Sequence, residues 1–270
     1  MLDRAFSSPR IEYLLLDVRS RQTIAMRWSH ADVPIPVGSL LKPFVALAYA
    51  ELHAGPSPHE SQFPVVFCHG KSDGCWHPAG HGSMSLERAL AASCNAYFLA
   101  LARSISAAGI PGVEALQRVS DRYGLPAPPA PVAPASLIGL SPEWRIFPLA
   151  LARAYGLLAT EAASNAQVGV QILAGLKLAA ERGGTASKVG MPLDGVLAKT
   201  GTAPCLSALK PDAEHCVANG DGLVVLLAPA DAPRLLLLVR KRGTTGSQTA
   251  DVAGRMLARI QHEDEHVALH

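Results

Sequence analysis

The chain has 270 residues, of which 49% are hydrophobic and 17% are charged, a composition that excludes a largely disordered protein. Lysine and arginine number 24 against 22 acidic residues and form no basic run, which argues against a nucleic-acid partner or a membrane-surface function. No apolar run is long enough to span a bilayer, so no transmembrane segment is expected.

The first third of the chain begins with strands and continues into a helix and a loop. Ile11–Val18 and Thr23–Trp28 are β-prone runs separated by four polar residues, which predicts a hairpin. Leu40–Leu52 is rich in leucine and alanine and predicts a buried helix, with Pro43 tolerated in its first turn. Residues 56–82 are dense in proline, glycine, serine and histidine, and we predict a loop there.

Helical patterns dominate the middle of the chain. Apolar residues recur at helical spacing in four stretches: Tyr97–Ala107, Val113–Tyr123, Leu149–Thr160 and Val168–Arg182. The segment Leu125–Pro134 is rich in proline and alanine, which excludes a regular helix or a central strand. It is predicted to be a surface connector.

Strand-like runs return near the C-terminus. They are Gly195–Ala203, Leu223–Ala228 and Arg234–Arg240, and the amphipathic stretch Thr249–Gln261 predicts a closing helix. Strands at both chain ends with helices between them predict an α+β fold, an antiparallel sheet flanked by helices plus a mostly helical subdomain. We expect a single domain, with a sheet lobe from about 1–36 and 190–270 and a helical lobe from about 37–189.

Five cysteines leave at least one thiol without an intrachain partner. Cys68 and Cys75 are close in sequence, and three histidines lie near them: His69, His77 and His81. Because this spacing is not that of a standard zinc finger, a loop disulfide or two plain thiols is favoured over a metal site. Cys205 and Cys216 bracket another loop and have the same interpretation. No metal and no cofactor are expected.

The pattern Ser39-Leu40-Leu41-Lys42 places a hydroxyl and an amine three residues apart at the start of the predicted helix. On a helix the two side chains share one face. A serine is a weak nucleophile until a neighbouring base takes its proton, and a buried lysine can supply a free amine for that purpose. The helix start also directs backbone N–H groups at developing negative charge.

Two further segments make this pattern specific. Ser93-Cys94-Asn95 interrupts a helical stretch, where its polar side chains could project into a cleft, and Lys199-Thr200-Gly201-Thr202 lies on a strand-like run. Separately, each has an ordinary explanation as a capping serine, a solvated asparagine or a surface lysine. A second Ser-x-x-Lys copy, Ser207 to Lys210, lies in a predicted loop before Pro211 and is interpreted as chance.

In this order, the three segments resemble the motifs of penicillin-binding proteins and serine β-lactamases. Val37 to Phe44 looks like the nucleophile segment of high-molecular-weight penicillin-binding proteins, and Leu16 to Met26 is similar to their opening hairpin. Gly80 to Phe98 resembles their second motif with its lead-in, and Phe147 to Tyr155 the helix before their third. The resemblance covers most of the chain. It departs after Asp221, where the family's usual aromatic residues are replaced by Gly222 and aliphatic residues.

The resemblance implies a penicillin-binding-protein-like fold and a role for each residue of the three motifs. Ser39 would form the acyl-enzyme, Lys42 would be its base, and Ser93 would relay a proton to the leaving amine. Asn95 would hold the substrate's amide. Lys199, Thr200 and Thr202 would bind its terminal carboxylate, Gly201 would let the substrate approach the backbone, and the N–H groups of Ser39 and Thr202 would form the oxyanion hole.

The activity implied is that of a D,D-transpeptidase-like enzyme acting on D-Ala-D-Ala-ended peptidoglycan stem peptides and acylated by β-lactams. The alternatives are a D,D-carboxypeptidase or β-lactamase with the same acyl-enzyme, and a catalytically silent binding or sensor domain. Cell-wall synthesis proteins are the expected protein partners, outside the cytoplasm. Because Met1–Arg10 lacks a basic region followed by an apolar stretch, no signal peptide is visible, and we expect a trimmed form of an exported protein.

Overall fold

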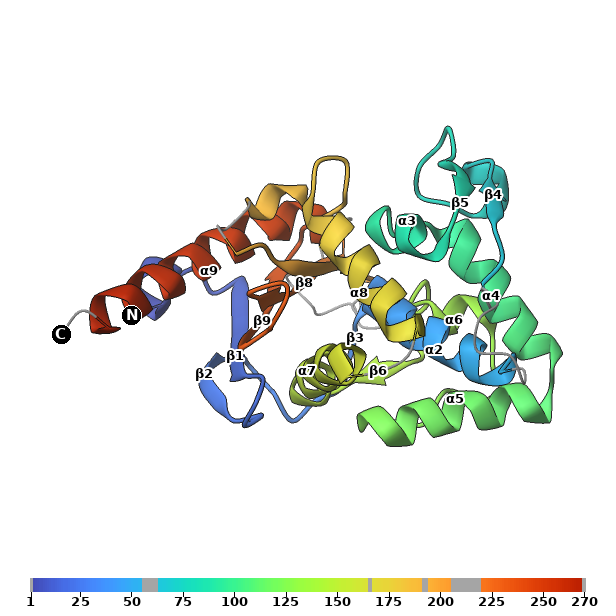
Figure 1. Ribbon diagram of the computed structural model, residues 1–270, viewed down its shortest axis with the longest axis horizontal. Coiled ribbons are helices and arrows are strands. Elements are labelled where there is room, and N and C mark those ends of the chain that lie inside the picture. The colour runs from blue at the N-terminus through green and yellow to red at the C-terminus, as the bar shows by residue number, and fades with distance from the viewer. Residues whose placement is uncertain (1, 55–62, 165–166, 191–193, 205–219, 269–270) are drawn as a thin grey trace, which may run out of the picture.

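The computed structural model describes residues 2–54, 63–164, 167–190, 194–204 and 220–268. Its main sheet is antiparallel and lies beside a group of helices (Figure 1). The strands follow the order β2-β1-β9-β8-β7, so both chain ends contribute to one sheet as predicted. Their bounds are β1 Ile11–Asp17, β2 Thr23–Arg27, β7 Leu197–Ala203, β8 Asp221–Ala228 and β9 Leu235–Arg242.

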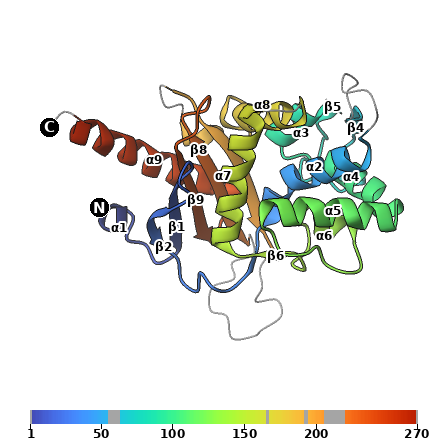
Figure 2. The same ribbon diagram turned by 60° about the horizontal axis from the view of Figure 1, so that its bottom comes forward.

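Both faces of this sheet are buried, because successive side chains of a strand point to opposite faces. On β8, Val225 packs into one core and its neighbour Val224 into another. Helix α9, Gly246–Ala268, covers one face, and helix α7, Pro148–Ser164, lies on the other (Figure 2). This double cover explains why the central strands are continuous apolar runs and do not alternate with polar residues.

The helical group surrounds α2, Lys42–Leu52, which contacts several of the helices that follow it in the chain (Figure 1). The remaining helices of this group are α3 Leu86–Ala91, α4 Asn95–Ala107, α5 Ile110–Tyr123, α6 Pro134–Leu137 and α8 Gln167–Ala180. Each of the longer ones matches a stretch predicted from helical spacing, with ends that differ by a few residues. The short α6 begins at the last proline of the predicted connector, a position where proline suits a helix.

Two small strand pairs complete the described fold, together with a four-residue helix at the N-terminus, α1 Leu2–Ala5. One joins β3, Ile35–Pro36, to β6, Arg145–Ile146, and the other joins β4, Val66–Cys68, to β5, Gly82–Met84. The second pair corrects our prediction of a loop over residues 56–82, because β4 lies in the middle of that range and β5 begins at its last residue. Strands of three residues carry too little alternation to be recognised from sequence.

Among the described helices, none is by itself long and apolar enough to cross a membrane. Helices α4 and α5 reach that length and composition only as a pair, with a bend of 117° between them.

A buried ion-pair network joins three strands of the main sheet. Glu12 on β1 is 2% exposed and accepts hydrogen bonds from Arg240 at 3.1 Å and Arg242 at 2.9 Å, both on β9. Arg240 also bonds Asp221 at the start of β8, and the backbone N–H of Ser29 donates to Glu12 at 3.0 Å. Removing Glu12 would leave Arg242 without this partner and Arg240 with Asp221 alone, in a place that water reaches only in part.

We predict that Glu12→Ala lowers the free energy of unfolding by about 3–5 kcal/mol, measured by urea denaturation. The matched control is Asp251→Ala, which breaks the exposed pair between Asp251 and Arg255 within α9. That variant should change stability by less than about 0.5 kcal/mol. Similar effects of the two substitutions would show that the buried network contributes no more than a surface pair.

Candidate active site

The nucleophile pattern lies where a short 3-10 helix, η1 Gly38–Leu41, continues into α2. Side chains three residues apart in a 3-10 helix are eclipsed, so Ser39 and Lys42 lie on the same side of this segment. The backbone N–H of Lys42 donates to the Ser39 carbonyl. Ser39 is partly exposed whereas Lys42 is fully buried, an arrangement that leaves the hydroxyl accessible and places the amine beneath the surface.

This segment lies directly against β7. Gly38 has a φ of +58°, and a Cβ built on it would lie 2.4 Å from the Thr202 carbonyl oxygen. A Cβ on Gly201 would similarly lie 2.5 Å from the Val37 carbonyl oxygen. Only glycine fits at these two positions, because any side chain would separate the two backbones. The backbone of Ser39 is thereby held close to that of Thr202.

The second motif occupies the turn between α3 and α4. Ser93 has a φ of +50°, in the left-handed region that non-glycine residues seldom adopt. Hydrogen bonds from the N–H groups of Ser93 and Cys94 to the carbonyls of Leu90 and Ala89 hold the turn. Such strain costs on the order of 1–3 kcal/mol and is found mainly at functional sites. Here it directs the Ser93 side chain towards the two lysines.

Ser93 joins the first motif to the third. Its hydroxyl lies 2.9 Å from the Lys199 amine and 3.3 Å from the Lys42 amine. Lys42 also donates to the Ser93 carbonyl and to Asn95 Oδ1, both at 2.7 Å, and Lys199 donates to the Thr200 carbonyl at 2.9 Å. Side chains from η1–α2, the α3–α4 turn and β7 therefore converge on one hydroxyl.

Both lysines are 0% exposed, so neither ammonium could be solvated by water. Burial lowers the pKa of Lys42 from 10.5 to about 7, although the nearby Cys94 and Cys75 thiols oppose that shift. Burial, and then the charge of Lys42, hold the pKa of Lys199 well below its ordinary value. Two ammonium groups beside the same hydroxyl would repel each other, so protonation of both amines is unfavourable. At neutral pH at least one of these amines is therefore uncharged and able to accept a proton.

The threonines of the third motif differ in their surroundings. Thr200 is buried and its hydroxyl donates to the Thr185 hydroxyl at 2.7 Å, a partner that the sequence motifs did not indicate. Thr202 is exposed and accepts a hydrogen bond from the Gly246 N–H at 3.0 Å. The Asn95 amide is engaged at both ends, with Lys42 on its oxygen and the Gly74 carbonyl 3.3 Å from its nitrogen.

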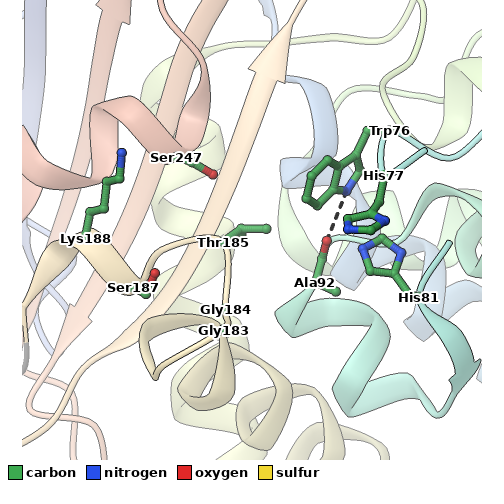
Figure 3. A pocket seen from close by; sticks show the side chains of 10 residues that line it. All are labelled: Trp76, His77, His81, Ala92, Gly183, Gly184, Thr185, Ser187, Lys188 and Ser247. Atoms are coloured by element: carbon green, nitrogen blue, oxygen red, sulfur yellow. Dashed lines mark hydrogen bonds between the residues drawn. The ribbon is translucent and has the colours of Figure 1, made fainter. Parts of the chain in front are cut away.

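A cavity of about 310 Å³ opens beside Thr185 (Figure 3). It is lined by Trp76, His77, His81, Ala92, Gly183, Gly184, Thr185, Ser187, Lys188 and Ser247. One wall comes from the segment before α3 and from Ala92, which follows that helix. The other comes from the segment between α8 and β7 and from Ser247 at the start of α9. Hydrogen bonds link the cavity to the lysine pair, because Thr185 accepts one from the Thr200 hydroxyl and the Thr200 carbonyl accepts one from Lys199.

Comparison with known proteins identifies the fold. No protein-family profile matches the chain, and no curated protein matches it in sequence. Among solved structures, Pseudomonas aeruginosa PBP2 in complex with WCK 5153 superimposes with a TM-score of 0.71 at 19% identity, covering 95% of this chain and 75% of that one. The transpeptidase domain of Burkholderia pseudomallei penicillin-binding protein 3 gives 0.67 at 15% identity, covering 95% and 90%.

A third solved structure, the complex between PBP2 and MreC from Helicobacter pylori, gives a TM-score of 0.72 at 15% identity, covering 96% of this chain and 62% of that one. The chain therefore has the fold of penicillin-binding protein transpeptidase domains, as the sequence motifs indicated. At these identities the likeness establishes the fold, and the chemistry must be argued from the site.

The lysine pair predicts a pH dependence of stability. An unfolded lysine titrates near pH ~10.4, whereas folded Lys42 has a pKa of about 7. Between these values the unfolded chain holds a proton that the folded chain lacks, so stability rises with pH by up to about 1.4 kcal/mol per unit. In urea denaturation at about pH 7 and about pH 9, Lys42→Met should show a smaller gain than the wild type, because only the contribution of Lys199, whose pKa is also lowered, remains.

The matched control is Lys177→Met, which removes an exposed lysine that pairs with Asp231. It should keep the wild-type gain in stability between the two pH values. An undiminished gain in Lys42→Met would mean that Lys42 is protonated in the folded protein, and the assignment of a free amine would be wrong.

Proposed function

We propose that this chain, which has the penicillin-binding protein transpeptidase fold, is a D,D-transpeptidase-like serine acyltransferase. Its substrates would be peptidoglycan stem peptides that end in D-Ala-D-Ala, and β-lactams would acylate it. The observation that carries the proposal is the pair of buried amines, Lys42 and Lys199, that meet at the Ser93 hydroxyl. Of the two, Lys42 lies three residues after the partly exposed Ser39.

The proposed first step uses Lys42 as the base. Its free amine takes the Ser39 proton as the Ser39 oxygen attacks the carbonyl carbon of the penultimate D-Ala. The close approach of the Gly38–Ser39 backbone to Thr202 supports an oxyanion hole made from the N–H groups of Ser39 and Thr202. Such donors stabilise the charge that develops on the carbonyl oxygen.

The second step expels the terminal D-Ala and leaves an ester on Ser39. The Ser93 hydroxyl gives its proton to the leaving amine and is reprotonated from Lys42, which is 3.3 Å away. Lys199, on the other side of Ser93, would meet the terminal carboxylate of the substrate together with Thr200 and Thr202. A bound carboxylate favours the charged form of Lys199, so substrate binding and the protonation of this lysine are coupled.

The acyl group then passes either to an amine, which forms a cross-link, or to water. Among the described residues, the buried carboxylate is Glu12, and it is occupied by two arginines in the main sheet. Asp73, an acidic residue of the segment before the second motif, pairs with His69 at 3.0 Å. Neither of these two carboxylates is available to activate water, which supports slow hydrolysis of an acyl-enzyme and argues against an efficient β-lactamase.

Peptidoglycan lies outside the cytoplasm, and we place the activity there. The Helicobacter pylori relative was solved with MreC, so a cell-wall synthesis protein is a reasonable class of partner for this chain as well.

A fluorescent penicillin should label the chain covalently and stay attached through denaturation in detergent. Ser39→Ala should abolish the labelled band, because the adduct is an ester of that hydroxyl. Ser207→Ala is a matched control, since Ser207 belongs to the second Ser-x-x-Lys copy and lies outside the described residues. Its label should match that of the wild type. Rapid loss of label with release of hydrolysed drug would indicate a β-lactamase.

Incubation with a peptide ending in D-Ala-D-Ala, with and without an amine acceptor, distinguishes the remaining functions by mass spectrometry. A transpeptidase yields a product that carries the acceptor, whereas a carboxypeptidase yields the shortened peptide in both reactions. Ser93→Ala should slow release of D-Ala by about 10²–10⁴-fold because the relay to the leaving amine is lost. Absence of any product from folded protein would support a silent binding domain.

A further inference from the structure

Four potential metal ligands meet beside the second motif. The ligand atoms of Cys68, Cys75, His81 and Cys94 all lie within 4.8 Å of one another. Cys68 ends β4, Cys75 follows the 3-10 helix η2 (Lys71–Asp73), His81 precedes β5, and Cys94 caps the start of α4. Sequence spacing missed this cluster because Cys94 belongs to another motif, 19 residues after Cys75.

The distances fit a tetrahedral site. Ligands around zinc, with bonds of about 2.3 Å to sulfur and about 2.0–2.1 Å to nitrogen, lie roughly 3.8 Å apart for two sulfurs and roughly 3.6 Å apart for sulfur and nitrogen. In the structure the Cys75 and Cys94 sulfurs are 3.8 Å apart. His81 Nδ1 lies 3.6 Å from the Cys68 sulfur and 3.4 Å from the Cys75 sulfur.

The three sulfurs lie in a buried place beside the start of α4. All three cysteines are at most 5% exposed and all three thiols are free. The backbone N–H groups of His77, Ala96 and Asn95 point at the Cys75 sulfur. Two of these donors belong to the first turn of α4, where the helix dipole also favours negative charge.

A disulfide explains the cluster less well. Its two sulfurs would have to approach to about 2.05 Å, and the Cys75 and Cys94 sulfurs are 3.8 Å apart. The free thiols rule out the loop disulfide between Cys68 and Cys75 in this structure, which was one of our two expectations. A disulfide would also use only two sulfurs and would need neither the third nor the imidazole nitrogen. A metal ion uses all four.

We propose that Cys68, Cys75, His81 and Cys94 form a Cys₃His site for one zinc ion. Three thiolates and a neutral imidazole are a donor set typical of closed structural zinc sites. Binding forms three Zn–S bonds and one Zn–N bond and releases to solvent the protons held by the thiols. The four protein ligands fill the tetrahedral coordination of the ion and leave no position for a substrate, so the ion has a structural role.

The place of the site indicates what it stabilises. The described chain between α2 and α3 has only β4, η2 and β5 as regular structure, so a crosslink there would replace the core that so short a segment lacks. Cys94 stands between Ser93 and Asn95, the two residues that meet the Lys42 amine. Coordination of Cys94 would therefore anchor the catalytic turn to the β4–β5 segment and make Cys94 a positioning residue.

Metal content and spectra test this inference without relying on enzymatic activity. Protein purified without an affinity metal column should contain about one zinc per chain by plasma mass spectrometry. Replacement by cobalt(II) should give the intense visible bands of a tetrahedral thiolate complex. Removal of zinc by a chelator should lower the melting temperature, because the ion binds the folded state.

His81 variants carry the decisive comparison, because His81 is only partly buried and its loss threatens folding less than loss of a buried cysteine. His81→Ala should weaken zinc binding by more than the roughly 10–100-fold that is typical when a residue hydrogen-bonded to a metal ligand is lost. His81→Cys should restore zinc binding with a changed cobalt spectrum. His77→Ala removes a neighbouring ring whose centroid lies 4.9 Å from that of His81, and should bind zinc like the wild type.

The inference would be overturned if folded protein contained no zinc and gave no cobalt–thiolate bands. It would also be overturned if His81→Ala bound zinc as tightly as the wild type, or if peptide mapping of native protein found Cys75 and Cys94 joined as a disulfide.

Discussion

Two fully buried lysines that share one serine hydroxyl are the constraint on which the rest of the site depends. Neither amine can be charged at low cost away from water, and each lies too near the other for both to be charged. Burial of the two amines and the strained backbone at Ser93 both destabilise the folded state, and the packing of the surrounding core offsets them. Such local instability is expected where chemistry needs a free amine, because a solvated lysine would be protonated at neutral pH.

The rest of the structure keeps three separate chain segments at this meeting point. Glycines at 38 and 201 let the nucleophile segment touch β7, and the Tyr155 hydroxyl donates to the Leu40 carbonyl at 2.8 Å. The double-covered sheet keeps β7 in place, so Lys199 is held by a rigid strand. The α3–α4 turn has no such sheet behind it. The proposed zinc site would supply the missing support, since it binds the residue between Ser93 and Asn95 to the β4–β5 segment.

Periodicity and motif order predicted much of this arrangement. Alternation and apolar runs located the strands of the main sheet, and the three motifs located residues that lie far apart in sequence and together in space. The sequence could not indicate the Thr185 partner of Thr200, because a threonine after a helix carries no pattern of its own. It could not assemble the cysteine–histidine cluster either, because metal templates depend on local spacing and Cys94 reaches the site through tertiary folding. Helix ends such as Asn95 and Pro134 depend on caps and packing that periodicity does not encode.

The most direct test of the central claim is an NMR titration of the lysine side chains in protein labelled with ¹³C-lysine, with Lys42 and Lys199 assigned from methionine variants. At neutral pH at least one of these two residues should have the Cε shift of an uncharged amine, while exposed lysines remain charged until about pH 10. If Lys42 and Lys199 both kept the Cε shift of a charged amine up to that pH, the folded site would contain no base for Ser39, and the assignment of a free amine would be contradicted.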